Sequence, residues 1–249
     1  MPRTMITDEH WLKLAAIFNQ INIYNKPDLR LSVEGMLYRI RVGCPWRDLP
    51  SEFGHWNSIF KKFNAWSAQG KWLKIFEAVV QEPDMEWLFV DGSYVRAHQH
   101  SSGAATEHDE AIAKSRGGNT TKIHLSVDAC GYPVAFEMTG GNINDATVAP
   151  ELLAKTPDAQ NVIADKGYDS EAIRDQVVEQ GGKPVIPRKK NSRKGNSDLD
   201  RGLYKLRHLA ENAFARLKHF RGVATRYDKL KRNFVSVVAL ACIFIWLPM

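Results

Sequence analysis

The residues at positions 86–93 read Glu-Trp-Leu-Phe-Val-Asp-Gly-Ser, and here the chain changes from helical to strand-like patterning. A short apolar run bounded by turn-forming residues is typical of a buried strand, so we expect a strand that ends at Asp91 with a tight turn after it. Residues 161–165, Asn-Val-Ile-Ala-Asp, repeat the pattern and end at Asp165. Ligands collect at strand ends in open α/β sheets. Two neighbouring strands of this kind would place both carboxylates at one sheet edge.

The order of the segments after residue 86 predicts an α/β fold. Residues 122–127 and 133–138 flank Asp-Ala-Cys-Gly, which is typical of a hairpin turn. A helix, the strand before Asp165, a second helix, a short strand, a basic loop and a last helix follow. This is the order of a ribonuclease-H-like mixed sheet with flanking helices.

The first part of the chain, residues 1 to about 82, has helical patterning and predicts a separate small all-α domain. The catalytic domain would then be residues 83–249. A short turn between residues 33–42 and a helix at 56–69 fits a helix-turn-helix-like arrangement. Lys61 and Lys62 lie beside the aromatic stripe of this last helix, and we expect them to contact DNA. An ordinary cationic face on a helical bundle is the alternative.

The positive charge is concentrated in one part of the sequence. The formal net charge is +6, yet residues 183–232 hold 16 lysines and arginines against four acids, a local net of +12. Such a block is usually a solvated surface, but here it surrounds Glu211, so contact with phosphates is the better explanation. Arg188, Lys189 and Lys190 form a loop in this block and are expected to bind DNA.

A third carboxylate comes from the pattern Tyr204, two residues, Arg207, three residues, Glu211, six residues, Lys218. On a continuous helix these four positions fall within about 60° of arc, so the acid would lie between cations and a phenol. Together with the two strand-terminal acids, Glu211 predicts a three-carboxylate site acting on nucleic acid. Hard oxygen ligands favour two Mg²⁺ ions, with Mn²⁺ as a substitute. Taken alone, each strand-terminal aspartate is better explained as a turn cap.

Other polar residues near these motifs have simpler explanations. Asp169 is expected to cap the helix that begins at about residue 171. Asp145, after a Gly-Gly pair, is expected to form a turn rather than bind a ligand. His124 alternates with apolar neighbours on its strand, and the sequence leaves open whether it faces the site.

These motifs resemble those of a known family. Val-Asp-Gly-Ser around Asp91, Ala-Asp-Lys-Gly-Tyr-Asp around Asp165 and the Tyr-Arg-Glu-Lys spacing resemble the DDE transposases of bacterial insertion sequences, in particular the insertion-sequence-five family. Residues 33–50 resemble the helical domain that precedes the catalytic domain there. The resemblance extends over nearly the whole chain.

The resemblance implies a DNA transposase that binds the terminal inverted repeats of its own element, hydrolyses the phosphodiester at the element ends and joins the freed 3′-hydroxyl to target DNA. It implies two Mg²⁺ held by Asp91, Asp165 and Glu211. It also implies that Tyr204, Arg207 and Lys218 contact the DNA backbone. Two element ends must be brought together, so a homodimer on double-stranded DNA is expected.

Two alternatives remain: a metal-dependent nuclease of the same fold without strand transfer, and a transposase-derived protein that only binds DNA. Three widely spaced cysteines without a Cys-x-x-Cys pair predict reduced thiols. The apolar run at residues 234–247 falls short of the ~20 residues that span a bilayer, so we expect a buried core helix there. No membrane partner and a cytoplasmic, nucleoid-associated location follow.

Overall fold

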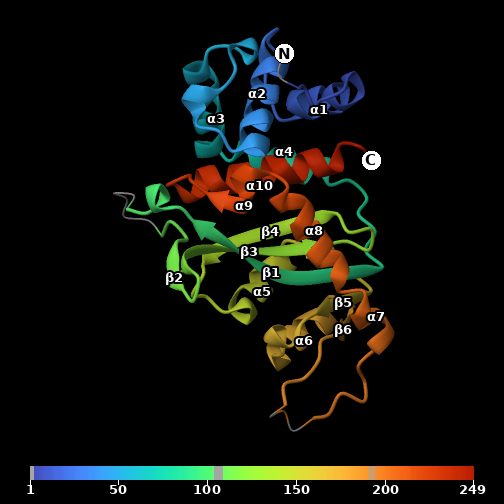
Figure 1. The fold of residues 1–249 in the computed structure, drawn as a ribbon. Coiled ribbons are helices and arrows are strands. Elements are labelled where there is room, and N and C mark those ends of the chain that lie inside the picture. Colours follow the sequence, from blue (N-terminus) through green and yellow to red (C-terminus); the bar gives the residue numbers. More distant parts are fainter. Residues whose placement is uncertain (1–2, 104–108, 191, 193) are drawn as a thin grey trace. The chain divides into compact units, whose positions relative to one another are not determined.

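The computed structural model describes residues 3–103, 109–190, 192 and 194–249. The chain forms two compact units (Figure 1). The helical unit contains Met1–Gln81, Arg96–Glu110 and Arg216–Met249, and the sheet unit contains Glu82–Val95 and Ala111–Ala215. One border between them lies at residue 82, but two later segments also belong to the helical unit. The division into domains 1–82 and 83–249 stays a prediction.

The helical unit is built from amphipathic helices around one apolar helix. Its elements are α1 (Asp8–Gln20), α2 (Leu29–Val42), η1 (Trp46–Asp48), η2 (Ser51–Phe53), α3 (Trp56–Ala68), α4 (Lys71–Val79), η3 (Gln99–Ser101), α9 (Arg221–Ala224), β7 (Thr225–Arg226) and α10 (Lys231–Trp246). Thr7 caps α1 by accepting a hydrogen bond from the amide of His10 at 3.2 Å. The side chain at such a cap satisfies an amide that has no partner within the helix.

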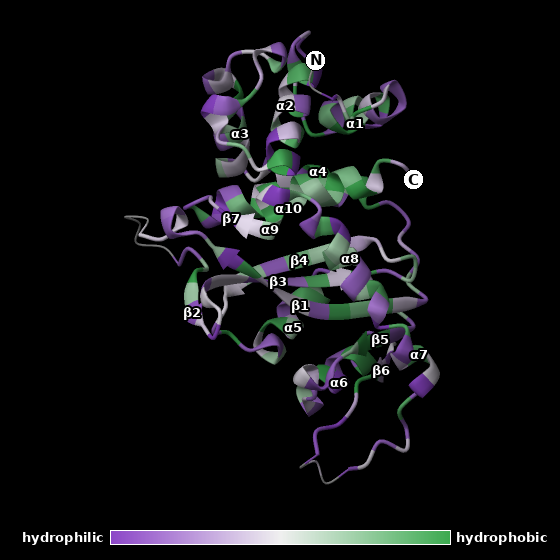
Figure 2. Ribbon diagram, viewed as in Figure 1, coloured by the Kyte–Doolittle hydropathy of each residue, from purple (hydrophilic) through white to green (hydrophobic). Residues whose placement is uncertain are grey.

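The C-terminal apolar run forms α10, the core helix that the sequence predicts. Ten of its residues are buried, from Phe234 to Trp246, and it packs on α3 and α4 within the helical unit. Figure 2 shows α10 as a largely apolar ribbon. In the part of the chain that the structure describes, no helix has the length and apolar character needed to cross a bilayer.

The connection between α2 and α3 is not the short turn expected from the sequence. It covers residues 43–55 and contains η1 and η2, whereas a helix-turn-helix joins its helices by three or four residues. The cause is apolar packing: Leu49 and Phe53 are buried, and a Cβ on Gly35 would lie 2.9 Å from the Cβ of Phe53. The connection is therefore part of the core of the helical unit, and the short turn expected from the sequence is corrected.

The sheet unit has the mixed sheet that the sequence predicts. Its elements are β1 (Trp87–Ala97), β2 (Ala113–Ser115), β3 (Gly118–Val127), β4 (Pro133–Gly140), α5 (Asp145–Ala154), β5 (Asn161–Ala164), η4 (Lys166–Tyr168), α6 (Glu171–Glu179), β6 (Lys183–Val185), α7 (Arg201–Lys205) and α8 (His208–Lys218), with β1 and α8 continuing into segments of the helical unit. The strand order is β2-β3-β1-β5-β6, and β4 pairs with β3. The β1–β5 and β5–β6 pairs are parallel, whereas β3 is antiparallel to β2 and β4.

The core of the sheet unit lies between one face of this sheet and helices α5 and α6. Leu88 and Val90 of β1 meet Leu152 of α5 and Val177 of α6 in one buried cluster. Phe89, which points to the opposite face by strand alternation, is also buried. Both faces of the central strands are therefore covered, as the continuous apolar runs of the sequence require.

Strand β1 does not end at Asp91. It runs on through Gly92 and Ser93 to Ala97, so the tight turn expected there is corrected. Only its pairing with β5 stops, because the last paired residues are Val90 and Ala164. Asp91 and Asp165 are the next residues on the two strands, and each follows the end of the parallel ladder.

Candidate active site

Asp91 and Asp165 lie side by side because they follow paired residues on neighbouring parallel strands, which are about 4.8 Å apart. The Asp91 side chain is 18% exposed, and its Oδ1 accepts a hydrogen bond from the amide of Gly92 at 2.8 Å. Burial raises the pKa of the Asp91 carboxyl, against the opposing effects of that amide and of the Arg207 guanidinium. The nearby negative charge of Asp165 raises this pKa further.

The direction of the Asp165 side chain is set by its own turn. Its Oδ1 accepts a hydrogen bond from the amide of Gly167 at 2.6 Å, so Asp165 caps η4. A Cβ at position 167 would lie 2.7 Å from this oxygen. Glycine is therefore needed here to let the carboxylate fold over the turn.

Glu211 reaches the strand ends from α8, but not on a helix that begins at Tyr204. The chain forms α7 (Arg201–Lys205), a break at residues 206–207, and then α8 from His208. The continuous helical face expected from the spacing is therefore corrected. The break keeps Arg207 beside the first turn of α8, where Glu211 lies. Tyr204 is half-buried on α7 and Lys218 is half-buried in the helical unit.

Arg207 joins two of the three acids. Its Nη1 donates to Oδ2 of Asp91 at 3.1 Å, and its Nη2 donates to Oε1 of Glu211 at 2.5 Å. One guanidinium thus bridges two carboxylates, of which Glu211 is the more exposed at 55%. Asp91 and Glu211, 120 positions apart in sequence, are brought together by this contact.

The three acids have the chemistry of a divalent-ion site. Their oxygens are the hard ligands that Mg²⁺ and Mn²⁺ prefer, and two of them already share a cation in the form of Arg207. Among the residues that the structure describes, no three His, Cys, Asp or Glu side chains converge closely enough to hold a metal ion. The chemistry of the donor set fits such ions, whereas in this arrangement the Arg207 guanidinium lies between Asp91 and Glu211.

A polar group that the sequence did not identify as part of the site lies behind Asp91. Asp145 is the first residue of α5, and its Oδ1 would be 2.4 Å from a Cβ on Gly92. Lys122 and His124 of β3 both approach this carboxylate, with Nζ–Oδ1 and Nδ1–Oδ1 distances of 3.2 Å. His124 therefore faces the side of the sheet on which Asp145 lies. The alternation of residues 122 and 124 on one strand face was the available signal.

Tyr168 places a phenol among these acids. It is 2% exposed, and its hydroxyl has no hydrogen-bond partner within the described residues. Burial raises its pKa well above the usual value, and the charges of Asp145, Asp91 and Asp165 add to the effect. The phenol is neutral at any physiological pH and can only donate a hydrogen bond or accept one.

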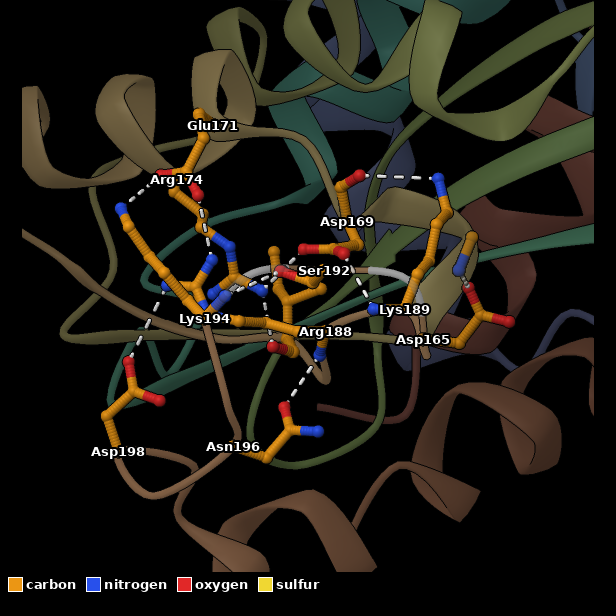
Figure 3. Close-up of polar contacts among 12 residues, drawn as sticks. Asp165, Asp169, Glu171, Arg174, Arg188, Lys189, Ser192, Lys194, Asn196 and Asp198 are labelled. Atoms are coloured by element: carbon orange, nitrogen blue, oxygen red, sulfur yellow. Dashed lines mark hydrogen bonds and ion pairs between the residues drawn. The ribbon is translucent and has the colours of Figure 1, made fainter.

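Asp169 does not cap α6, as the sequence suggested, because Ser170 occupies the cap position. Its carboxylate instead takes a 2.9 Å bond from Arg174 Nη2 and a 2.7 Å bond from the amide of Lys189. Arg174 also donates to the carbonyl of Ile186 at 2.6 Å. These bonds tie the start of α6 to the segment that follows β6 (Figure 3).

Two basic side chains of this loop contact other groups of the protein, although the composition of the loop suggests that they are exposed to solvent. The Arg188 side chain is 9% exposed and lies 2.8 Å from Glu171 and 3.8 Å from Asp198; Figure 3 shows the three side chains turned toward one another. The Nζ of Lys189 donates to the carbonyl of Asp169 at 3.3 Å. Lys190 is exposed. In the helical unit Lys61 is also exposed, whereas Lys62 donates to Ser32 at 2.8 Å.

Comparison with known proteins gives the class. Residues 82–246 match the model of the transposase DDE domain, and residues 6–76 match that of the putative transposases of the IS4/5 family. The chain therefore belongs to the DDE-domain transposases, which confirms the resemblance seen in its motifs. Membership implies an enzyme that acts on phosphodiester bonds, and DDE transposase domains use divalent metal ions.

Two curated relatives and one solved structure illustrate the likeness. A putative transposase for insertion sequence element IS6501 from Brucella ovis is 35% identical over 128 residues, which is 51% of this chain and 98% of that protein. A putative transposase for element IS402 from Burkholderia cepacia is 31% identical over 136 residues, covering 50% of this chain and 62% of the relative. A piggyBac transposase synaptic complex with hairpin DNA aligns with a TM-score of 0.42 and 10% identity, over 76% of this chain and 50% of that one.

Proposed function

We propose that this chain moves its own insertion sequence. It binds the terminal inverted repeats, hydrolyses the phosphodiester at each element end and joins the 3′-hydroxyl to target DNA. The observation that carries the proposal is the geometry of the acids. Asp91 and Asp165 follow the last pair of two adjacent parallel strands, and Arg207 holds Glu211 beside Asp91.

Asp91, Asp165 and Glu211 would hold two Mg²⁺ ions, with Mn²⁺ as the substitute. When bound, such ions make the attacking oxygen a better nucleophile and neutralise charge on the leaving oxygen. The protein sets the direction of the acids: Gly92 and Gly167 each donate an amide hydrogen bond to one oxygen, on Asp91 and Asp165 respectively. The second oxygen of each aspartate is not engaged by these amides.

Arg207 is suited to bind the phosphate that is cut. A guanidinium binds phosphate oxygens through parallel N–H donors, and the Arg207 side chain is 27% exposed. Cations held by Asp91 and Glu211 would free the donors of Arg207 for the DNA. We propose that Arg207 then exchanges carboxylate contacts for phosphate contacts.

The two covalent steps use the same kind of centre. In the first, the oxygen of a water attacks the phosphorus, the bond from phosphorus to the 3′-oxygen breaks, and that oxygen takes a proton to become the element's free 3′-hydroxyl. In the second, this hydroxyl loses its proton and attacks a target phosphorus, and a target 3′-hydroxyl leaves. No net oxidation occurs in either step.

We propose that further basic residues contact the DNA backbone. Lys190 and Lys61 are exposed and suited to phosphates, whereas Arg188 and Lys62 already have partners in the protein. Tyr204, Lys189 and Lys218 complete the set expected from the sequence. A homodimer would hold two element ends together, and a DNA substrate would place the protein at the nucleoid in the cytoplasm.

The test uses labelled duplexes that carry the inverted repeats flanking the coding region, incubated with the purified full chain and Mg²⁺ or Mn²⁺. The native chain is expected to nick the ends and join them to a target plasmid. Asp91→Ala, Asp165→Ala and Glu211→Gln should each reduce nicking to background while retaining DNA binding in a gel-shift assay. Arg207→Ala should weaken binding and flatten its salt dependence.

Asp158→Asn is the matched control, because it removes one acid from an exposed position and should leave nicking unchanged. Full nicking by any variant of the three acids would remove that residue from the proposed role. Cleavage without joining would identify a nuclease. Binding without either reaction by the native chain would identify a DNA-binding protein only.

A further inference from the structure

The placement of Asp145 links it to the catalytic strand. Its carboxylate occupies the space in which a side chain at position 92 would lie, 2.4 Å from that hypothetical Cβ. Gly92 directly follows Asp91, so this acid packs against the backbone that carries the first catalytic carboxylate. The start of α5 is fixed separately, since Asn144 caps it by accepting a 3.1 Å hydrogen bond from the amide of Ala146.

Lys122 is the counterion of this acid and is nearly inaccessible to solvent. Its side chain is 4% exposed, and Nζ lies 3.2 and 3.3 Å from the two oxygens of Asp145. Nζ also donates to the carbonyl of Ile143 at 3.0 Å and lies 4.5 Å from the ring centroid of Tyr94. A buried ammonium with these partners is held in one position.

His124 supports the same carboxylate from the next position on that strand face. Its Nδ1 lies 3.2 Å from Oδ1 of Asp145, and its Nε2 is 2.8 Å from the hydroxyl of Thr139. Burial alone would raise the pKa of Asp145, but His124 and the Lys122 ammonium hold it below the usual value. Asp145 is thus an anion balanced by Lys122 beside the Asp91 strand.

A balanced pair at this place has an electrostatic consequence. Buried charges interact over several ångströms with less screening than surface charges. With both members present, the field of each charge at the acids of the active site opposes the field of the other. Without Asp145 the ammonium would oppose the entry of divalent cations, and without Lys122 the carboxylate would favour it.

We propose that Lys122 and Asp145 are positioning residues whose matched charges set the divalent-ion affinity of the site formed by Asp91, Asp165 and Glu211. This inference rests on the proposed function, because it takes these acids as the ion ligands. An ion pair with a purely structural role would not give the following result. The two single neutralisations should change ion affinity in opposite directions.

The experiment measures Mn²⁺ binding to the purified full chain by electron paramagnetic resonance, which counts free ions and needs no turnover. Asp145→Asn should weaken Mn²⁺ binding roughly tenfold and Lys122→Met should strengthen it roughly tenfold, as expected for one uncompensated charge partly screened by the protein. The double variant should bind within about threefold of the native chain, because both charges are gone. Circular dichroism checks that each variant is folded.

Lys155→Met is the matched control. Lys155 also pairs with acids, Glu137 and Glu151, but it follows the opposite end of α5, about 15 Å along the helix axis. Its loss changes net charge by the same amount and should not change Mn²⁺ affinity. If Asp145→Asn does not fold, Lys122→Met compared with the double variant isolates the Asp145 charge and should show the same tenfold difference.

The failure of this inference and that of the proposed function are distinguishable. If the native chain binds Mn²⁺ and Asp91→Asn does not, the proposed ligands stand. Equal or same-direction shifts in the two single variants would then overturn the role of the pair alone. Absence of Mn²⁺ binding that depends on Asp91 would overturn the proposed ligand set and the inference with it.

Discussion

Burial of the Asp91 carboxylate works against the stability of the folded chain. The side chain is 18% exposed, and the effect of removing it from water exceeds the favourable effects of the Gly92 amide and Arg207, so its pKa is raised. Active sites commonly hold ionisable groups in such unfavourable surroundings. In Asp91 the same burial would strengthen the attraction to a bound cation.

The raised pKa of Asp91 makes its contribution to the stability of the folded chain depend on pH. An acid with a raised folded-state pKa binds its proton more tightly in the folded chain, so its contribution is fully present below the unfolded pKa and is lost as pH rises through the folded pKa. Asp91→Asn should therefore raise the melting temperature at pH 7 in the absence of divalent ions. The gain should become smaller as the pH falls toward 4, because protonation of the Asp91 carboxyl removes the buried charge.

Differential scanning fluorimetry at both pH values measures this change, with Asp158→Asn as the control for losing an exposed negative charge. A lower melting temperature for Asp91→Asn at pH 7 would mean that the Arg207 contact outweighs burial. The folded-state pKa of Asp91 would then be lowered rather than raised.

At the level of single elements, the break between α7 and α8 decides how the third acid is delivered. The spacing from Tyr204 to Lys218 predicts one helical face, whereas the helix is interrupted at residues 206–207. Asp200 caps α7 through a 3.0 Å bond from the amide of Leu203, so α7 has its own beginning. Arg207 and Glu211 still meet, since Arg207 directly precedes α8 and Glu211 lies in its first turn.

The segment after β6 divides its cations between structure and surface. We predict that Lys190→Ala leaves the melting temperature unchanged, weakens DNA binding across sequences and reduces the slope of log Kd against log salt by about 1. Arg188→Ala should lower the melting temperature, because its nearly buried guanidinium pairs with Glu171 and Asp198. Thermal melts and gel shifts at several salt concentrations measure both.

The Lys190→Ala and Arg188→Ala variants together distinguish a contact with DNA from a structural role. A change in DNA affinity without any loss of stability in Arg188→Ala would show that this arginine leaves its partners to bind phosphate. An unchanged salt slope in Lys190→Ala would show that this lysine does not contact the backbone.

Considering the whole molecule, the helical unit depends on the C-terminal end of the chain. Trp72, Ile75 and Phe76 of α4 are almost fully buried, and α4 packs on α10. Each such side chain is worth about 1.5–3 kcal/mol when buried. The N-terminal helices therefore draw much of their stability from residues 231–246, far away in sequence.

The fragment 1–82 is accordingly predicted not to unfold cooperatively when produced alone. The same fragment joined by a flexible linker to residues 216–249 should regain a cooperative melt and helical circular dichroism. A cooperative transition in the short fragment would show that residues 1–82 form a self-sufficient domain. The comparison tests the two-domain division directly.

The local sequence determined the parts of this protein that depend on neighbours along the chain. Apolar runs such as residues 87–90 and 161–164 predicted the central strands, and the Asp-Ala-Cys-Gly turn predicted the β3–β4 hairpin, because burial and turn formation act on adjacent residues. The same runs indicated Asp91 and Asp165 as candidate ion ligands, and the Tyr-Arg-Glu-Lys spacing added Glu211; this assignment is a proposal.

Only the tertiary structure decided which distant groups meet. Lys122 and Asp145 pair behind Asp91 because α5 packs on β3, and the sequence offered no reason to prefer this contact over a turn. Likewise, Arg188 is held inside by acids rather than displayed to solvent. Charge pairing at a distance depends on packing geometry, which the pattern of a single segment does not contain.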